Sequence, residues 1–554
     1  MKPSEQFLYL QTIVLLAFIS WAKAGLWKPW SDWFLLAVIV GGAVGLLLIR
    51  YSEGSRFDFP WKPLLPYLVL ILVIGGSLLN PSFKKPYAEL LNLEAFEEAA
   101  RRDPGLVAYV GDEFNDIIRS AEQDTGRAIA LFLRFSRDFQ ERFGSYDSPF
   151  DKLIENFSNE IHKAHIAWLP NAIVSETSIW QRFLPLALAS LQGVLLWRFI
   201  RSRRVIRRLF FFIAANGALL AIAGTLQKLS YSPGELVKEI WGIWDAPEPR
   251  YYFASFTYKN HWSAFALLSI ALATGLGLRE MRNQGILAWR KPILPACVAI
   301  IALTSVSIPL SGSRSGTGFL LFFLLALMVY LGIHAAGQFQ GRFKKAQILI
   351  STLLTSACVA GGLLWFGSGL HKETKSEAIV NTVRQWEDMK SGSMPMRYYL
   401  WKDTWAMFAD KPLFGHGLGS FRALHPIYQS PEYKIQREAG TASAHRKLKP
   451  LTEHSHNDWF QFLAETGFVG VLLIISVPIL GLWKVRHCLS SVSTWALFGC
   501  LLFTIYSFFD FPSRTPACLV GFVVILALGI KYAELDSKRN THRKPSRIRK
   551  AKVV

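Results

Sequence analysis

The stretch GFVGVLLIISVPILGLW, residues 467–483, decides the fold class of this chain. It carries no charged residue, and as a helix it is about long enough to cross a bilayer core of roughly 30 Å. Similar apolar stretches recur along the 554 residues, of which 51% are hydrophobic and 18% charged. A closed barrel would instead need alternating segments of about ten residues. The sequence therefore predicts an all-α polytopic membrane protein.

We expect about twelve transmembrane helices. Their expected limits are 6–24, 33–49, 63–80, 178–199, 208–227, 260–278, 293–310, 315–333, 346–366, 467–483, 492–510 and 516–532. The first segment lacks a small-residue cleavage site and a second span follows it closely. Both observations argue against a cleaved signal peptide.

The net charge of +21 is concentrated in short connections between spans. Lys and Arg crowd the ranges 198–208, 279–291 and 342–345 and the tail from 531 to 552. With twelve spans these ranges share one side, which is the positive-inside pattern and places both termini in the cytoplasm. The charge is thus explained by topology and attraction to anionic membrane lipids, and we expect no nucleic-acid partner.

Two large segments face outward in this topology, 81–177 and 367–466. The first shows apolar residues at helical spacing and is predicted to be an extracytoplasmic helical insertion, either a stabilising cap or a docking module. The second holds six of the twelve histidines and is the predicted catalytic loop, because long loops are usually functional. The remaining predicted parts are the transmembrane regions 1–80, 178–366 and 467–532 and a basic cytoplasmic tail, 533–554.

Two short motifs lie at the outward ends of predicted spans. In SGSRSG, residues 311–316, Arg314 stands among small residues; an ionisable group at membrane depth is costly and suggests function, although it could also reach the interface by snorkelling. In FTYKNHWSAF, residues 256–265, Tyr258 and Asn260 precede a span. They could anchor the helix in the membrane interface and cap it.

A third motif is RYYLWKDTWAMFADKPLFGHGLGSF, residues 397–421. Arg397, Trp401 and Trp405 recur every four residues and so share one helix face. The following glycines match neither a dinucleotide-binding fingerprint nor a phosphate-binding P-loop. Gly417 and Gly419 permit a tight turn, which could be structural or could cradle a ligand.

The fourth motif, HSHN at residues 454–457, has two histidines one residue apart. In a helix His454 and His456 would point about 200° apart, and no Cys-rich or His-Glu-x-x-His pattern accompanies them, so no metal site is predicted. Asn457 or Asp458 could cap the following helix. A histidine here could also take a proton from a hydroxyl near neutral pH.

Together these motifs resemble the O-antigen ligase/polymerase superfamily of bacterial membrane glycosyltransferases. TYKNHWSAF resembles the start of a family span, and SGSRSG its Ser-Arg-Gly turn with Ser315 intervening. The 397–421 motif is similar to the family's Arg-x-x-x-Trp helix and glycine turn. HSHNDWFQFLAETGFVG, residues 454–470, is similar to its His-Asn motif. The resemblance spans roughly 250–530.

The resemblance implies transfer of a glycan from undecaprenyl pyrophosphate to an acceptor hydroxyl, at the outer face of the bacterial inner membrane. The acceptor is a lipid for ligases, a growing glycan for polymerases, and protein for O-oligosaccharyltransferases. No nucleotide sugar, cofactor or metal is implied. By correspondence, the resemblance implies a catalytic role for His456 as general base and for Arg314 and Arg397 as pyrophosphate ligands. The expected substrate-binding residues are His454, Asn457, Tyr258, Asn260, Trp401, Gly417 and Gly419.

The insertion at 81–177 departs from the family, whose members have shorter connections there, and it leaves the acceptor class open. A transporter is an alternative, but the sequence shows no internal repeat and few mid-membrane charges. A non-catalytic scaffold that docks partners on its outer loops is a further alternative.

Overall fold

The computed structural model describes residues 2–54, 61–79, 176–230, 239–245, 251–336, 347, 393–433 and 452–550. The chain forms two compact units. Unit 1 consists of Met1–Asp58, Ala187–Lys390 and Leu482–Val554, and unit 2 of Phe59–Leu186 and Ser391–Gly481. The predicted insertion at 81–177 and the predicted span at 346–366 lie almost wholly outside the described residues, so both stay predictions.

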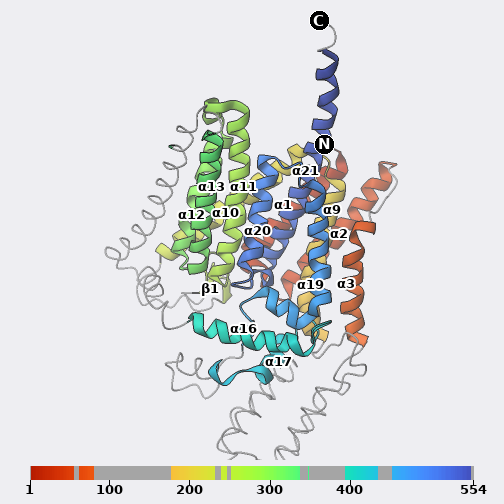
Figure 1. Cartoon of the computed structure of the whole chain (residues 1–554), viewed down its shortest axis with the longest axis vertical. Helices are drawn as coiled ribbons and strands as arrows, with labels where there is room; N and C mark the ends of the chain where they lie inside the picture. The colour runs from red at the N-terminus through yellow and green to blue at the C-terminus, as the bar shows by residue number, and fades with distance from the viewer. Residues whose placement is uncertain are drawn as a thin grey trace, which may run out of the picture. The chain divides into compact units, whose positions relative to one another are not determined.

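Helices dominate the described residues, as predicted (Figure 1). Unit 1 contains α1 (Pro3–Trp21), α2 (Trp30–Ser52), α10 (Arg203–Leu229), α11 (Lys259–Gln284), α12 (Ile293–Leu310), α13 (Arg314–Ala336), α20 (Ser491–Tyr506) and α21 (Pro516–Lys550). It also has the 3-10 helices η1 (Lys23–Gly25), η2 (Gly285–Arg290) and η4 (Pro512–Arg514), and an antiparallel pair, β1 (Glu239–Ile240) and β2 (Trp244–Asp245). Unit 2 contains α3 (Trp61–Leu79), α16 (Ser393–Asp410) and α17 (Phe421–Tyr428), while α9 (Glu176–Phe199) and α19 (Asp458–Val485) have residues in both units.

Seven helices of the described part are long and apolar enough to cross a membrane. They are Trp30–Ser52, Arg203–Leu229, Lys259–Arg290, Ile293–Leu310, Arg314–Ala335, Asp458–Val485 and Pro516–Lys538, and each overlaps a predicted span. The predicted spans at 6–24, 63–80, 178–199 and 492–510 coincide with α1, α3, α9 and α20, which are not among these seven. The protein is therefore a multi-pass helical membrane protein, and the total of twelve spans stays a prediction.

Helix α11 forms the centre of unit 1. It packs against α10, α12 and α20, and its apolar window is wholly buried inside the unit. Small residues make this close packing possible, as is common between membrane helices. At Gly217 of α10, for example, an added Cβ would lie 2.3 Å from the hydroxyl oxygen of Ser269. This packing fixes the end of α11 that carries Asn260.

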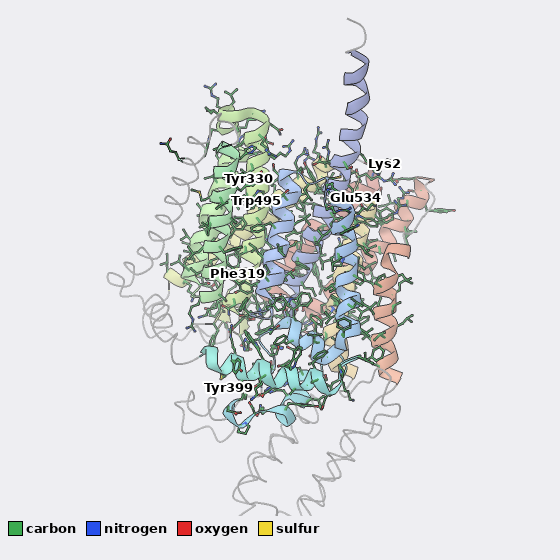
Figure 2. The ribbon with its side chains drawn as sticks, in the orientation of Figure 1. Lys2, Phe319, Tyr330, Tyr399, Trp495 and Glu534 are labelled. Atoms are coloured by element: carbon green, nitrogen blue, oxygen red, sulfur yellow. The ribbon has the colours of Figure 1, made fainter. Side chains whose placement is uncertain are left out.

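Aromatic rings join α13 to α20. The rings of Phe319 and Tyr506 have centroids 5.0 Å apart, and those of Tyr330 and Trp495 are 5.5 Å apart in an edge-to-face contact. Figure 2 shows Tyr330 and Trp495 close together where the two helices meet. Edge-to-face geometry is a favoured arrangement of aromatic rings. These contacts hold the Arg314 end of α13 in register with the Tyr506 end of α20.

Unit 2 has its own apolar core around Leu70, Ile74 and Leu418, with Phe183 and Phe462 packed against it. These residues come from α3, α9, α19 and the glycine-rich segment after α16. Helix α16 runs crosswise to α3 and α19 (Figure 1), and Tyr399 on it is labelled in Figure 2. The core thus ties the end of α16 to α19.

Candidate functional site

The glycine-rich segment after α16 docks onto a break in α19. Gly467 interrupts the helix with a φ of +65°. Past this break, the backbone N–H of Phe468 donates to the carbonyl of Pro412 at 2.8 Å, and that of Val469 donates to Leu413 at 3.1 Å. The N–H of His416 in turn donates to the carbonyl of Ala464 at 2.9 Å. The glycine-rich segment is therefore hydrogen-bonded to α19 on both sides of the break.

The glycines of this turn adopt backbone angles that other residues rarely take. Gly415, Gly417 and Gly419 have φ values of +68°, +96° and +86°. Between the last two, Leu418 inserts its side chain into the core of unit 2 and is 4% exposed. These observations support the structural interpretation of the turn. Ligand contact by Gly417 and Gly419 stays a prediction.

Asn457 is the N-cap of α19, which decides between the two capping candidates. Its side-chain oxygen accepts a hydrogen bond from the backbone N–H of Phe460 at 3.0 Å, the pattern expected of an N-cap. Asp458 is the first residue of the helix. The side chain of Asn457 is 2% exposed, so its capping role is well supported, and substrate contact by it stays a prediction.

His456, directly before the cap, has a left-handed backbone conformation with a φ of +53°. Such a conformation costs a non-glycine residue about 1 kcal/mol or more and persists only where neighbours enforce it. The hydroxyl of Ser455 does so by donating to the carbonyl of Asn457 at 2.7 Å and accepting from its N–H at 3.2 Å. The half-buried His456 side chain is therefore presented from a tightly specified turn.

A chain of buried polar groups fixes this turn to α19. The side-chain oxygen of Gln461 accepts from the backbone N–H of Ser455 at 3.2 Å, and its amide nitrogen donates to Glu465 at 2.8 Å. All three residues are 0% exposed. Because buried polar groups are expensive unless paired, this arrangement restricts the turn to one geometry.

The predicted Arg397–Trp401–Trp405 face of α16 packs on the first turns of α19. The ring of Phe460 lies 6.4 Å from that of Trp401 and 5.8 Å from that of Trp405, measured between centroids. Arg397 lies one turn before Trp401 on the same face and is half-buried. Unit 2 thus brings the Arg397 face and the His456 turn to the same end of α19.

Two polar contacts join α16 to α17 and the residues after it. His425 Nε2 lies 3.7 Å from the carboxylate of Asp403, whose other oxygen accepts from the N–H of Ser430 at 3.2 Å. The phenol of Tyr428 donates to the carboxylate of Asp410. Burial, the hydrogen bond to Asp410 and the charge of Asp410 all raise the pKa of Tyr428. The neutral phenol is therefore the form that the fold favours.

Arg314 belongs to unit 1 and is the first residue of α13. The hydroxyl of Ser313 donates to the side-chain oxygen of Asn260 at 2.7 Å and accepts from the N–H of Gly316 at 3.1 Å. The amide nitrogen of Asn260 donates to Asp510. Asn260 is thus a buried group that orders the Arg314 turn, and substrate contact by it stays a prediction.

The sequence reasoning missed the segment FDFPSRTP, residues 509–516, between the last two predicted spans. Asp510 is 0% exposed, and its other oxygen accepts from the N–H of Phe511 at 2.9 Å. His261 lies 3.9 Å from that oxygen and contacts the hydroxyl of Thr515 at 2.7 Å. The signal was two ionisable residues at the end of a span, Asp510 before Pro512 and Arg514 after it, the criterion that identified Arg314.

Tyr258 packs by its ring against this segment. Its centroid lies 5.5 Å from that of Phe511 and 4.9 Å from that of His261. The amide nitrogen of Asn260 lies 3.3 Å from the Tyr258 hydroxyl. Tyr258 therefore forms part of the same polar cluster as Asn260 and Asp510, and a substrate contact by it stays a prediction.

The first histidine of the motif, His454, has a cationic neighbour. His454 Nδ1 lies 3.3 Å from Nη2 of Arg182, which comes from α9. A metal ion at that nitrogen would have to displace the guanidinium. Among the residues that the structure describes, no group of three or more His, Cys, Asp or Glu is arranged to hold a metal ion. Sequence reasoning also missed Arg182, the single charged residue between Glu176 and Arg198 in α9.

The long apolar helices define a multi-pass helical membrane protein. Hydrogen bonds between buried polar groups hold the turns at the ends of several of these helices. Residues 299–475 match the family described as O-Antigen ligase. This match supports the O-antigen ligase superfamily, which the motifs predicted. The match includes Arg314, Arg397 and His456. No curated protein sequence matches the chain.

Proposed function

We propose that this protein transfers a glycan from undecaprenyl pyrophosphate to an acceptor hydroxyl, in the manner of an O-antigen ligase. The observation that carries the proposal is the joining, in unit 2, of the Arg397 face and the His456 turn at one end of α19. Both lie within the residues that match the O-antigen ligase family. The costly backbone geometry at His456 fits a site that needs an oriented side chain.

In this proposal His456 is the general base. It takes the proton of the acceptor hydroxyl while that oxygen forms a bond to the anomeric carbon of the glycan, and the bond from that carbon to the pyrophosphate oxygen breaks. A fixed base contributes by both proton transfer and orientation. The hydrogen bond from the Ser455 hydroxyl to the Asn457 carbonyl, and that from the Ser455 N–H to Gln461, supply the rigidity that this requires.

Arg397 and Arg314 bind the pyrophosphate in this proposal. The leaving group gains negative charge as the bond breaks, and guanidinium groups bind phosphate oxygens bidentately and remain charged. Fixed charges act most strongly when they need no reorganisation during the reaction. The packing of Trp401 on Phe460 and the hydrogen bond of Ser313 to Asn260 provide such fixed supports. His454, Tyr258, Asn457, Gly417 and Gly419 would shape the substrate site.

We favour a lipid acceptor, and the growing glycan of a polymerase and a protein hydroxyl are the alternatives within the superfamily. The proposed location is the bacterial inner membrane, with the catalytic loop in the periplasm and both termini in the cytoplasm. Anionic membrane lipids would contact the basic cytoplasmic connections.

The test is deletion of the gene, followed by glycan analysis of surface lipid, secreted polymer and protein. We expect the glycan to disappear from surface lipid and the lipid-linked donor to accumulate. Complementation with the wild-type gene should reverse both changes, whereas His456→Ala should reverse neither. Loss of glycan from polymer or protein alone would reassign the acceptor. Unchanged glycans in all three fractions would refute the transferase.

A further inference from the structure

Arg182 joins α9 to the histidine motif although the two are 272 residues apart in sequence. The proposed reaction does not use this side chain. Its helix carries no other charged residue from Thr177 to Trp197, so a charged group there carries a desolvation cost. Such a cost is tolerated where the charge meets specific partners.

The contact with His454 determines how that imidazole is protonated. A guanidinium has only donors and stays charged. The nitrogen that faces Arg182 Nη2 at 3.3 Å, Nδ1 of His454, must therefore be the acceptor. The proton of the neutral ring then resides on Nε2. Arg182 thus selects one neutral tautomer of His454.

Besides His454, Arg182 interacts electrostatically with nearby carboxylates. The carboxylates that act on it electrostatically belong to Glu465, Asp458 and Glu453. Glu465 and Asp458 are 0% and 2% exposed, and buried carboxylates require a compensating partner. Because three carboxylates already act on this guanidinium electrostatically, a pyrophosphate would compete poorly for it.

Both sets of contacts converge on the turn that carries His456. Arg182 meets His454 directly, on one side of Ser455. It also attracts Glu465, which accepts from Gln461, and Gln461 accepts from the N–H of Ser455. The guanidinium therefore acts on the turn by two routes.

We propose that Arg182 is a positioning residue that orders the 454–457 turn and fixes the Nε2-protonated tautomer of His454, so that His456 is aligned with the acceptor hydroxyl. This inference rests on the proposed transferase function and assigns it a positioning residue outside the catalytic loop.

The test compares Arg182→Met with wild type in proteoliposomes that contain a lipid-linked glycan donor and the acceptor. We expect kcat to fall at least tenfold while the KM for the donor changes less than twofold, because alignment is lost and donor binding is kept. Arg198→Met, at the other end of α9, is the matched control and should transfer at the wild-type rate. A large rise in donor KM at unchanged kcat would make Arg182 a donor ligand and overturn the proposal.

Substitutions at His454 test whether Arg182 acts through this residue. His454→Asn places an amide oxygen close to the position of Nδ1, so it should keep the contact with Arg182 and lose less of kcat than His454→Ala. His454→Ala should lower kcat, and adding Arg182→Met to it should lower the rate less than threefold further. Equal rates for His454→Asn and His454→Ala, or fully multiplicative effects in the double variant, would contradict the proposal.

Arg182→Lys keeps the charge and a donor, and it carries the same test if Arg182→Met does not fold. It should lose less of kcat than a neutral variant, at an unchanged donor KM. A wild-type kcat in any neutral Arg182 variant would overturn the inference. Absence of transfer by wild type and by Arg198→Met would instead refute the proposed function itself.

Discussion

Gly467 of α19 lies directly against the backbone of Leu413, so that a Cβ at position 467 would lie 2.2 Å from the Leu413 carbonyl oxygen. The break in the helix and the turn after α16 are thus one structure. The carbonyl of Ala464 accepts from His416 rather than from Phe468, whose N–H bonds to Pro412. The turn thus supplies partners for the Ala464 carbonyl and for the N–H groups of Phe468 and Val469, which the break releases, as burial requires.

Gly467→Ala should therefore destabilise unit 2 and stop transfer. The positive φ alone costs about 1 kcal/mol or more for alanine, and the overlap with Leu413 adds to it, so we expect a loss of more than about 2 kcal/mol. Thermal unfolding in detergent and a transfer assay measure the two effects. Gly318→Ala is the control, because a Cβ there meets no atom within 4 Å. Equal unfolding temperatures for both variants would contradict this account of the break.

Replacing His456 should lower the transfer rate without lowering the stability of the protein. Asparagine tolerates the left-handed conformation better than most residues, so His456→Asn should leave the unfolding temperature unchanged or raise it slightly. Without the imidazole, transfer should fall by roughly 10² or more. The unfolding temperature and the transfer rate, measured on the same purified sample, test these two expectations. A stable variant that transfers at the wild-type rate would remove His456 from the mechanism.

We expect that the role of Arg397 requires the planar guanidinium group, which can bind two phosphate oxygens at once, and not only a positive charge. Arg397→Ala should abolish transfer, and Arg397→Lys should lower it more than about tenfold, because lysine cannot bind phosphate oxygens bidentately. Lys402→Ala removes an exposed cation from the same helix and should leave the rate unchanged. Comparable rates for Arg397→Lys and wild type would show that general positive charge is sufficient.

The sequence allowed much of this architecture to be predicted, because its signals were periodic or local. Apolar length located the helices, and four-residue spacing placed Arg397, Trp401 and Trp405 on the face that contacts Phe460. Capping is equally local, and Asn457 was one of two candidates. In each case the relevant residues lie within a few turns of one another.

The remaining features depend on contacts between distant segments. Gly467 reads in the sequence as a small residue in a span, and only its contact with Leu413 explains it. Arg182 meets His454 across 272 residues. Asp510 bonds to Asn260 across 250 residues. No periodicity encodes such pairings, so a single sequence could not predict them.

Asn260 provides a test of whether the Arg314 turn must be ordered. Asn260→Ala removes the acceptor for Ser313 and the donor to Asp510. Asn216→Ala is a matched control, since this buried amide also makes two side-chain hydrogen bonds, to Trp21 and Ser20. Both variants should lose about 1–3 kcal/mol of stability. Only Asn260→Ala should lower the transfer rate of the folded protein, and an equal loss in both would reduce the role of Asn260 to stability.

The hydrogen bond from Tyr428 to Asp410 predicts a specific pH dependence. The folded protein raises the pKa of Tyr428, so the neutral phenol is stabilised. Its contribution is complete below about pH 10, the usual tyrosine pKa, and is lost as the pH rises from there towards the folded-state value. Tyr428→Phe should thus lower the unfolding free energy by about 1 kcal/mol at pH 7 to 9, and the difference from wild type should shrink above pH 10. Tyr398→Phe, with its ring 63% exposed, should show neither effect. A difference that stays constant above pH 10 would mean that Tyr428 contributes by packing instead of through its phenolic proton.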